Sequence, residues 1–123
     1  MEKQEMNLIN LYNAKGEKHG LWMKYYSNDQ LMWKGHYVNG KEEGYCESYY
    51  DNGQLYSKGH YANGNREGLW KFYHPTGQLW ETGHYVNGKQ EGLWEGYYDN
   101  GQLNYKGHWV NGFRSEEHTS ELQ

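Results

Sequence analysis

Four histidines recur at a constant interval and are the residues best suited to bind a metal. His36, His60, His84 and His108 are each separated by 24 residues. An imidazole nitrogen that binds zinc sits about 2.0 to 2.1 Å from the ion. If each interval corresponds to one β-hairpin, neighbouring histidines lie two strands, about 9.5 Å, apart. They are then too far apart to share an ion, so we expect no metal and no other cofactor.

Acid–base or nucleophilic chemistry has no better support in the sequence. Glu43, Glu67 and Glu91 recur at the same interval, at the ends of repeats where solvated charges are common. The single cysteine, Cys46, stands where other copies have Trp. No Ser, Cys or Lys falls in a recognised nucleophile motif. We therefore expect no catalytic residues and no enzymatic activity.

The same interval of 24 residues organises almost the whole chain. A fixed period of this length is typical of repeat architectures. We interpret residues 13–113 as one repeat domain that follows an N-terminal tail, residues 1–12. The domain begins with a partial copy at 13–19. The full copies are 20–43, 44–67, 68–91 and 92–113.

Each copy contains two turn signals. In YYDNGQLYSKGHYANG, residues 49–64, the pairs Asn52-Gly53 and Asn63-Gly64 are flanked by aromatic residues. Asn-Gly favours a two-residue type I′ turn, because both central residues of that turn have φ > 0. Two strands per copy follow, for example about 69–74 and 78–86. The sequence therefore predicts an all-β antiparallel meander of 24-residue β-hairpin repeats.

Two-residue turns would fix which residues face each other across a hairpin. With Asn52-Gly53 at the tip, Tyr50 faces Leu55. The same offset gives the pairs Cys46 and Gly59, Trp22 and Gly35, Trp70 and Gly83, Trp94 and Gly107, Glu47 and Lys58, and Glu95 and Lys106. We expect each indole to lie over the glycine that it faces. A bulge at the turn would shift part of this assignment by one residue.

This register gathers aromatic residues on one face of the sheet, together with Leu31, Leu55, Leu79 and Leu103. Most of these rings are expected to hold a thin sheet together, but rings left partly exposed would form a protein-binding surface. The predicted binding residues are Trp22, Tyr26, Tyr37, Tyr50, Tyr61, Trp70, Tyr85, Trp94, Tyr98 and Trp109. The other face mixes Leu and Tyr with lysines and the four histidines.

Composition and charge exclude several classes of function. Only 35% of the 123 residues are hydrophobic, whereas 18% are aromatic, which suits a thin structure with little interior. Without the last ten residues, eleven Lys and Arg face thirteen Asp and Glu, a net charge of −2. A basic stripe for nucleic acid and a Lys/Arg cluster for anionic lipid are both lacking. We expect neither nucleic-acid nor membrane binding.

The last ten residues, RSEEHTSELQ at 114–123, interrupt the repeat. Earlier copies end with Glu and the next begins with Gly, but Ser115 and Glu116 stand at these positions. The segment resembles the translated readthrough of a sequencing adapter. We therefore expect residues 114–123 to be a non-native tail, and the alternative is a genuine polar tail.

The repeated pattern of Gly, Leu or Tyr, Trp, two residues, Tyr-Tyr, then Asn-Gly-Gln-Leu and Lys-Gly-His-Tyr resembles the MORN repeat in its bacterial, antitoxin-like variant. The resemblance covers about residues 13–113 and recurs in four copies. It implies an elongated, single-layer, twisted antiparallel sheet that binds proteins and has no catalytic site. Cys46 in a Trp position, Asp29 in a Gly position and His74-Pro75 depart from the pattern.

We therefore predict a non-catalytic repeat scaffold that binds a partner protein, and the resemblance suggests a toxin as that partner. The alternative is a structural protein that self-assembles into filaments or tubes through its terminal strands and aromatic faces. No small-molecule substrate is indicated. MEKQEMN lacks the apolar stretch of a secretory signal, and no run of about 18 or more apolar residues occurs. We expect a cytoplasmic location, or an extracellular one for a fibre.

Overall fold

The described part of the chain forms one sheet of short strands. The computed structural model describes residues 8–115. Neighbouring strands pair antiparallel in the order β1-β2-β3-β5-β6-β7-β8-β9-β10-β11, and β4 pairs with β3. This confirms the predicted all-β meander. The strands are β1 (Leu11–Tyr12), β2 (Lys18–Tyr25), β3 (Leu31–Val38), β4 (Lys41–Glu42), β5 (Gly44–Tyr49), β6 (Leu55–Ala62), β7 (Asn65–Tyr73), β8 (Leu79–Val86), β9 (Lys89–Tyr97), β10 (Leu103–Val110) and β11 (Phe113–Ser115).

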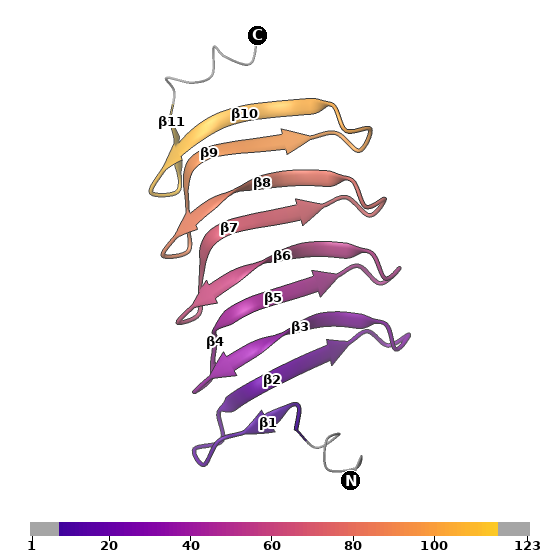
Figure 1. The fold of residues 1–123 in the computed structure, drawn as a ribbon, viewed down its shortest axis with the longest axis vertical. Coiled ribbons are helices and arrows are strands. Elements are labelled where there is room, and N and C mark those ends of the chain that lie inside the picture. The colour runs from indigo at the N-terminus through magenta and orange to yellow at the C-terminus, as the bar shows by residue number, and fades with distance from the viewer. Residues whose placement is uncertain (1–7, 116–123) are drawn as a thin grey trace.

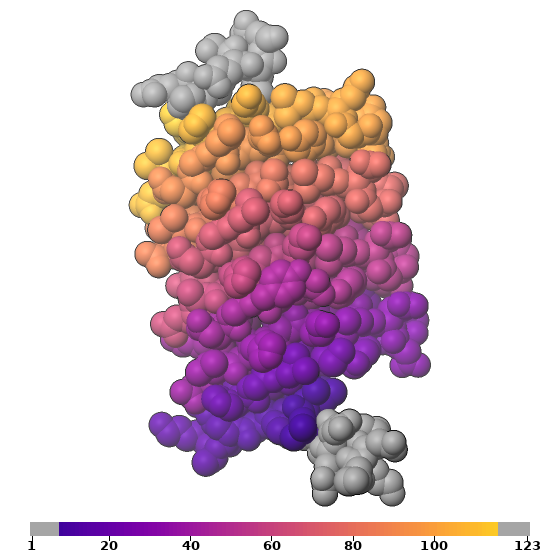
Figure 2. Space-filling model, viewed as in Figure 1, coloured from indigo at the N-terminus to yellow at the C-terminus, as the bar shows by residue number. Residues whose placement is uncertain are grey.

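The hairpins stack along the long axis of the molecule in sequence order. Figure 1 shows their turns alternating between two opposite sides of the sheet. In Figure 2 the colours run as bands across the molecule, so each hairpin contacts the one before it and the one after it. Residues 8–115 form this single sheet without a second layer, as the resemblance implies. The sheet includes Leu11 and Tyr12 at one edge and Arg114 and Ser115 at the other, whereas residues 116–123 of the predicted tail lie outside the described residues.

The turns that link one hairpin to the next have the predicted form. Asn63 and Gly64 have φ of 53° and 87°, so both central residues are left-handed. Ala62 pairs with Asn65 directly across the turn. The equivalent Asn-Gly pairs at 39–40, 87–88 and 111–112 repeat these angles closely. These are type I′ turns, whose twist matches that of the flanking strands.

The loops within the hairpins differ from the prediction. The Tyr50 N–H donates to the Gln54 carbonyl at 2.8 Å, and the Gly53 N–H donates to the Tyr50 carbonyl at 3.0 Å. Of the loop residues 51–53, only Gly53 has a positive φ, 90°. The loop is therefore a three-residue connection whose third residue is left-handed, not a two-residue type I′ turn. In the first hairpin Asp29 occupies that position with φ 70°.

The three-residue loop changes the pairing next to it. Tyr49, not Tyr50, pairs with Leu55, and a bulge then restores the predicted register from Ser48 and Ser57 onward. The predicted pairing of Tyr50 with Leu55 is therefore wrong. Because paired residues point to the same face, the four leucines lie on the face opposite to the predicted one. The observed pairs are Leu31 with Tyr25, Leu55 with Tyr49, Leu79 with Tyr73 and Leu103 with Tyr97.

Farther from the loops the predicted register is confirmed, and it places the core on one face. Trp22 pairs with Gly35, Trp70 with Gly83 and Trp94 with Gly107. We call the face that carries Trp22, Trp70 and Trp94 the Trp face, and the face that carries His36, His60, His84 and His108 the His face. The buried hydrophobic residues are Trp22, Tyr37, Cys46, Trp70, Phe72 and Trp94.

The indoles lean toward a different glycine from the one predicted. A Cβ added to Gly59 would lie 2.2 Å from the Trp70 ring, so this ring covers a glycine of the preceding hairpin and not Gly83. The Trp70 Nε1–H donates to the His60 carbonyl at 2.9 Å. Trp94 lies over Gly83 in the same way. Each of these two tryptophans therefore joins its own hairpin to the preceding one.

Cys46 interrupts this series, and Trp33 fills the space that results. A Cβ on Gly35 would lie 2.6 Å from the Trp33 ring and 2.9 Å from the Cys46 Cβ. Other copies have Ser57, Glu81 or Tyr105 at the position of Trp33. A small residue has replaced one Trp, and a second Trp one strand away covers the same glycine. Burial raises the pKa of the Cys46 thiol to about 12.

Candidate functional site

The structure brings most of the ten predicted binding residues into ring contact on the Trp face. Tyr61, Trp70, Tyr85 and Trp94 alternate edge to face, with ring centroids 5.2 Å apart for Tyr61 and Trp70 and for Tyr85 and Trp94. Trp109 continues this row beside Trp94. At the other end of the sheet, Trp22 and Tyr37 form a similar pair. Tyr26, Tyr50 and Tyr98 lie at the hairpin loops, where the Tyr50 ring contacts that of Tyr56, with centroids 5.1 Å apart.

Four of these ten rings are buried in the core. Trp22, Tyr37, Trp70 and Trp94 are 8%, 6%, 1% and 0% exposed. They cannot contact a partner without leaving the core. Tyr61, Tyr85 and Trp109 are partly buried against the same cluster. Tyr98, at 52%, is the most exposed of the ten.

The loop tyrosines tie one hairpin to the next. The Tyr26 hydroxyl donates to the Tyr49 carbonyl and the Tyr50 hydroxyl donates to the Tyr73 carbonyl, each at 2.6 Å. At the next equivalent position His74 Nε2 lies 2.7 Å from the Tyr97 carbonyl. The replacement of Tyr by His therefore preserves the link, and these side chains have a structural role.

The middle of the Trp face is covered by the chain itself. The Arg66 guanidinium lies 4.8 Å from the Trp70 ring centroid, 5.3 Å from that of Phe72 and 5.4 Å from that of Tyr85. It also donates to the Tyr85 hydroxyl at 3.1 Å. Cation–π contacts of this kind stabilise rings that would otherwise face water. Arg66 thus shields the aromatic row from a partner.

The recurring histidines lie on the His face, one in each hairpin. His36, His60 and His84 are exposed. Within residues 8–115, no three His, Cys, Asp or Glu side chains are placed so that they could hold a metal ion. His60 instead contacts the Tyr45 ring, with centroids 5.4 Å apart.

The recurring glutamates have a role that the sequence did not predict. Their carboxylates accept the backbone N–H of the Asn in the following linking turn, at 2.8 or 2.9 Å. They therefore fix the stacking of consecutive turns, whereas the sequence predicts only solvated charges. The pairs are Glu43 with Asn63, Glu67 with Asn87 and Glu91 with Asn111.

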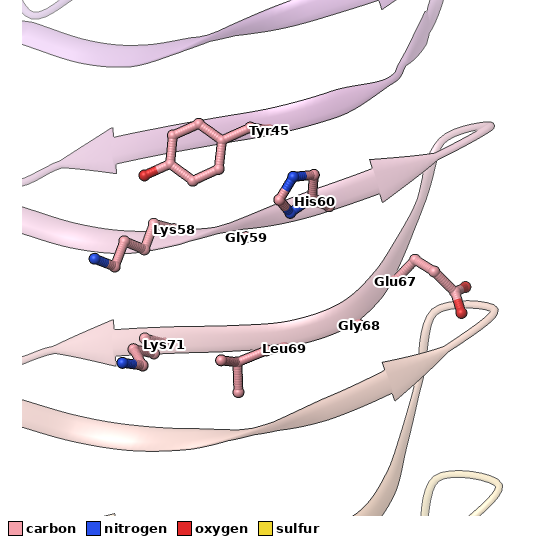
Figure 3. Close-up of a pocket in the computed structure, with 8 residues that line it drawn as sticks. All are labelled: Tyr45, Lys58, Gly59, His60, Glu67, Gly68, Leu69 and Lys71. Atoms are coloured by element: carbon pink, nitrogen blue, oxygen red, sulfur yellow. The ribbon is translucent and has the colours of Figure 1, made fainter.

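The His face carries a hollow of about 460 Å³ where β5, β6 and β7 run side by side. Figure 3 shows the Lys58 and Lys71 side chains extending in the same direction, with Leu69 beside Lys71 and the Glu67 carboxylate at the opposite end. The hollow coincides with a register shift between Lys58 and His60, where β7 has extra residues opposite Gly59. The lining residues are Tyr45, Lys58, Gly59, His60, Glu67, Gly68, Leu69 and Lys71.

A smaller hollow of about 210 Å³ lies one repeat farther along the His face. It coincides with the equivalent register shift between Thr82 and His84. Its lining differs in charge, since Thr82 and Glu95 replace Lys58 and Lys71. The register shift that both copies share therefore forms the hollow, and the side chains of each copy determine the charge of its lining.

Tyr45, which lines the larger hollow, is hydrogen-bonded to the carboxylate of Glu47 on the same strand. The Glu47 carboxylate accepts the Tyr45 hydroxyl at 2.7 Å and the Tyr49 hydroxyl at 2.5 Å. The Tyr49 hydrogen bond is the main cause that holds the pKa of Glu47 below its ordinary value. Burial raises the pKa of Tyr49 to about 12. The hydrogen bond to Glu47 therefore holds the Tyr45 ring in place at the hollow.

The sequence prediction missed the residues of this hollow, above all Tyr45, Leu69 and Lys71. One signal was present: Lys71 stands where other copies have Glu47 and Glu95. This substitution matters only because β6 and β7 pair so that Lys71 lies directly opposite Lys58. The linking turn does not predict this pair, because a register shift lies between the turn and Lys58.

Comparison with known proteins is consistent with this geometry. The family model described as MORN repeat variant matches residues 18–39, 42–63, 66–87 and 90–111. No curated protein matches the chain. No helix among the described residues is long and apolar enough to cross a membrane. Four matches at the spacing of the hairpins cover most of the chain, and the protein therefore belongs to the MORN repeat family.

Proposed function

We propose that the protein is a non-catalytic scaffold that binds a partner protein through its His face. The observation that carries this proposal is the exposure of apolar side chains there. Tyr45, Leu69 and Leu93 are 43%, 48% and 40% exposed, and they occupy the same position in successive hairpins. Clustered exposed apolar groups beside hollows are typical of protein-binding surfaces.

The spacing of this stripe supports a partner that spans several repeats. Equivalent residues in successive hairpins lie two strands, about 9.5 Å, apart. Leu21 precedes Tyr45 in the same series, so the four copies give four contact points. A partner that crosses the strands would contact one such point in each hairpin.

Binding through the Trp face is a weaker proposal, restricted to the predicted residues that keep some exposure. Of these, Tyr98 is the most accessible. The remaining partly exposed rings contact one another or the next hairpin. We therefore place the main binding surface on the His face.

We further propose a toxin as the partner, so that this protein would be the antitoxin of a toxin–antitoxin pair in the cytoplasm. This part of the proposal rests on the resemblance to the bacterial, antitoxin-like variant. A scaffold without chemistry of its own would neutralise a toxin by covering the working surface of that protein.

The test is capture of a partner from source cells with matched variants of the full chain. Leu69→Ser with Leu93→Ser alters the His face, and Tyr98→Ser removes an exposed ring elsewhere. We expect the double variant to lose about tenfold in affinity and Tyr98→Ser to retain it. Loss only in Tyr98→Ser would place binding on the Trp face. Absence of any protein retained specifically by the wild type would contradict partner binding.

The second candidate function is self-assembly into filaments or tubes. The observation that favours it is that β1 and β11 form the two edges of the described sheet, where backbone groups can pair with another copy. Light scattering and electron microscopy over a range of protein concentrations test it. Filaments without a partner would support assembly, and a monodisperse small species would exclude it.

A further inference from the structure

We propose that the larger hollow binds a carboxylate from an acidic segment of the partner protein. This inference rests on the proposed function and names the chemistry that the His face recognises. The residues that carry it are Lys58, Lys71, Leu69 and Tyr45, all of which line the hollow.

The first argument is an unusual pairing of like charges. Lys58 on β6 pairs directly with Lys71 on β7. Like charges directly opposite each other destabilise a sheet. The equivalent pairs between the other hairpins are Lys34 with Glu47 and Thr82 with Glu95, so neither sets like charges opposite each other. The hollow therefore concentrates positive charge on a chain whose formal net charge is −4.

The second argument concerns the groups that could neutralise these lysines. Glu47 faces Lys58 from β5, and the Lys58 ammonium also lies 6.0 Å from the centroid of the Tyr73 ring. Thr82 faces Lys71 from β8 and is uncharged. The Glu67 carboxylate accepts a backbone N–H at 2.9 Å and lies at the far end of the hollow in Figure 3. The Lys71 ammonium, which faces only Lys58 and the uncharged Thr82, is thus left for an external anion.

The third argument selects an acidic protein segment as the occupant. Two lysines are too few for a surface that binds anionic lipids, which takes about four to eight clustered cations. Leu69 is exposed beside Lys71, and the Tyr45 ring lies across the hollow. An Asp or Glu next to an apolar residue would place its carboxylate on the lysines and its neighbour on Leu69.

The experiment measures fluorescence anisotropy of the full chain with a labelled peptide of alternating Leu and Glu. Lys58→Gln with Lys71→Gln removes the paired cations. The matched control, Lys34→Gln with Lys106→Gln, removes two lysines of the same face that each face a glutamate. We expect about a tenfold loss of affinity in the first variant and less than about twofold in the control.

Three results would overturn the inference. These are no binding of the peptide by the wild type, equal losses in the two variants, or binding of phosphatidylserine vesicles in place of the peptide. If the partner is captured equally by the wild type and by Lys58→Gln with Lys71→Gln, the proposed function stands and this inference fails.

A stability measurement tests the charge argument without any ligand. Lys71→Glu places a carboxylate opposite Lys58, which is the pairing found between Lys34 and Glu47 one repeat earlier. We expect it to raise Tm by about 2 °C, relative to Lys71→Gln, while it abolishes peptide binding. A fall in Tm below that of Lys71→Gln would show that no repulsion exists, and would overturn the inference.

Discussion

At the scale of single residues, the joint between hairpins depends on two glycines that have no room for a side chain. Gly59 and Gly83 lie under Trp70 and Trp94, and an added Cβ at either position would lie 2.2 Å from ring atoms. At Gly107 the added Cβ would meet the Arg114 guanidinium at 2.9 Å, and this flexible group can move aside.

We expect Gly59→Ala and Gly83→Ala each to lower the free energy of unfolding by about 2 to 3 kcal/mol, because the indole must leave its position. Gly107→Ala is the control and should cost less than about 1 kcal/mol. Urea denaturation monitored by Trp fluorescence measures all three. Equal losses at the three positions would show that the indoles do not join the hairpins.

Cys46 and Trp33 form a compensated pair that a double-mutant cycle can test. Cys46→Trp alone places a second indole where Trp33 already covers Gly35, so we expect a loss of about 1 to 3 kcal/mol in stability. Trp33→Ser alone opens a cavity and should also destabilise. The double variant should recover at least about 1 kcal/mol relative to the sum of the single losses. Strict additivity would contradict the pairing.

Burial of Cys46 predicts a pH dependence of stability. Its pKa is raised to about 12 in the folded chain, against about 8.5 in the unfolded chain. A raised pKa contributes stability that is present below pH 8.5 and is lost as the pH rises toward 12. Urea denaturation between pH 8 and 11 should show a steeper decline for the wild type than for Cys46→Ala. Parallel declines would mean that the Cys46 thiol has the same pKa in the folded and the unfolded chain.

At the scale of the hairpin, the sequence predicted the strands and most of the register but misassigned one of two similar turns. Both turns contain Asn-Gly, yet only the linking turn is type I′. The hairpin loop uses three residues and needs a left-handed residue only at its third position. Thr76, which precedes Gly77 in the third copy, was the available clue, because a type I′ turn would force this β-branched residue to a positive φ.

The candidate site was less predictable than the fold. Alternation along a strand predicted which residues share the Trp face, and ring contacts bear this out for Trp70 and Tyr85. It could not predict that the rings lean toward the preceding hairpin, because pairing alone does not give the side-chain rotamer. The hollow depends on a register shift opposite Gly59, which has no signal within one hairpin.

The first hairpin loop offers a test of the assigned backbone geometry. Asp29 has φ 70°, a conformation that costs a non-Gly residue free energy. We expect Asp29→Gly to raise the free energy of unfolding by about 0.5 kcal/mol. Asp51→Gly, at a loop position with ordinary φ, is the control and should give no gain. Thermal denaturation compares the two, and an equal gain would argue against strain at Asp29.

At the scale of the whole molecule, the main contacts of each hairpin within residues 8–115 are with its neighbours, so stability should be a sum of terms for the hairpins and for the contacts between them. Deletion of residues 68–91 would bring Trp94 over Gly59, which is the joint that Trp70 now makes. We expect a folded sheet with one hairpin fewer and a denaturant m value lower by roughly a quarter. Complete loss of cooperative unfolding would contradict a modular sheet.

The His face is proposed as the binding surface because the Trp face carries the buried core residues of this single-layer sheet. The most direct test is the solvent exchange of the indole N–H groups, measured by NMR on the free protein. Trp70 and Trp94 donate to backbone carbonyls and are 1% and 0% exposed, whereas Trp80 is 38% exposed. We expect the indole N–H groups of Trp70 and Trp94 to exchange far more slowly than that of Trp80. Equally fast exchange at all three would show that the Trp face is open to solvent and available to a partner.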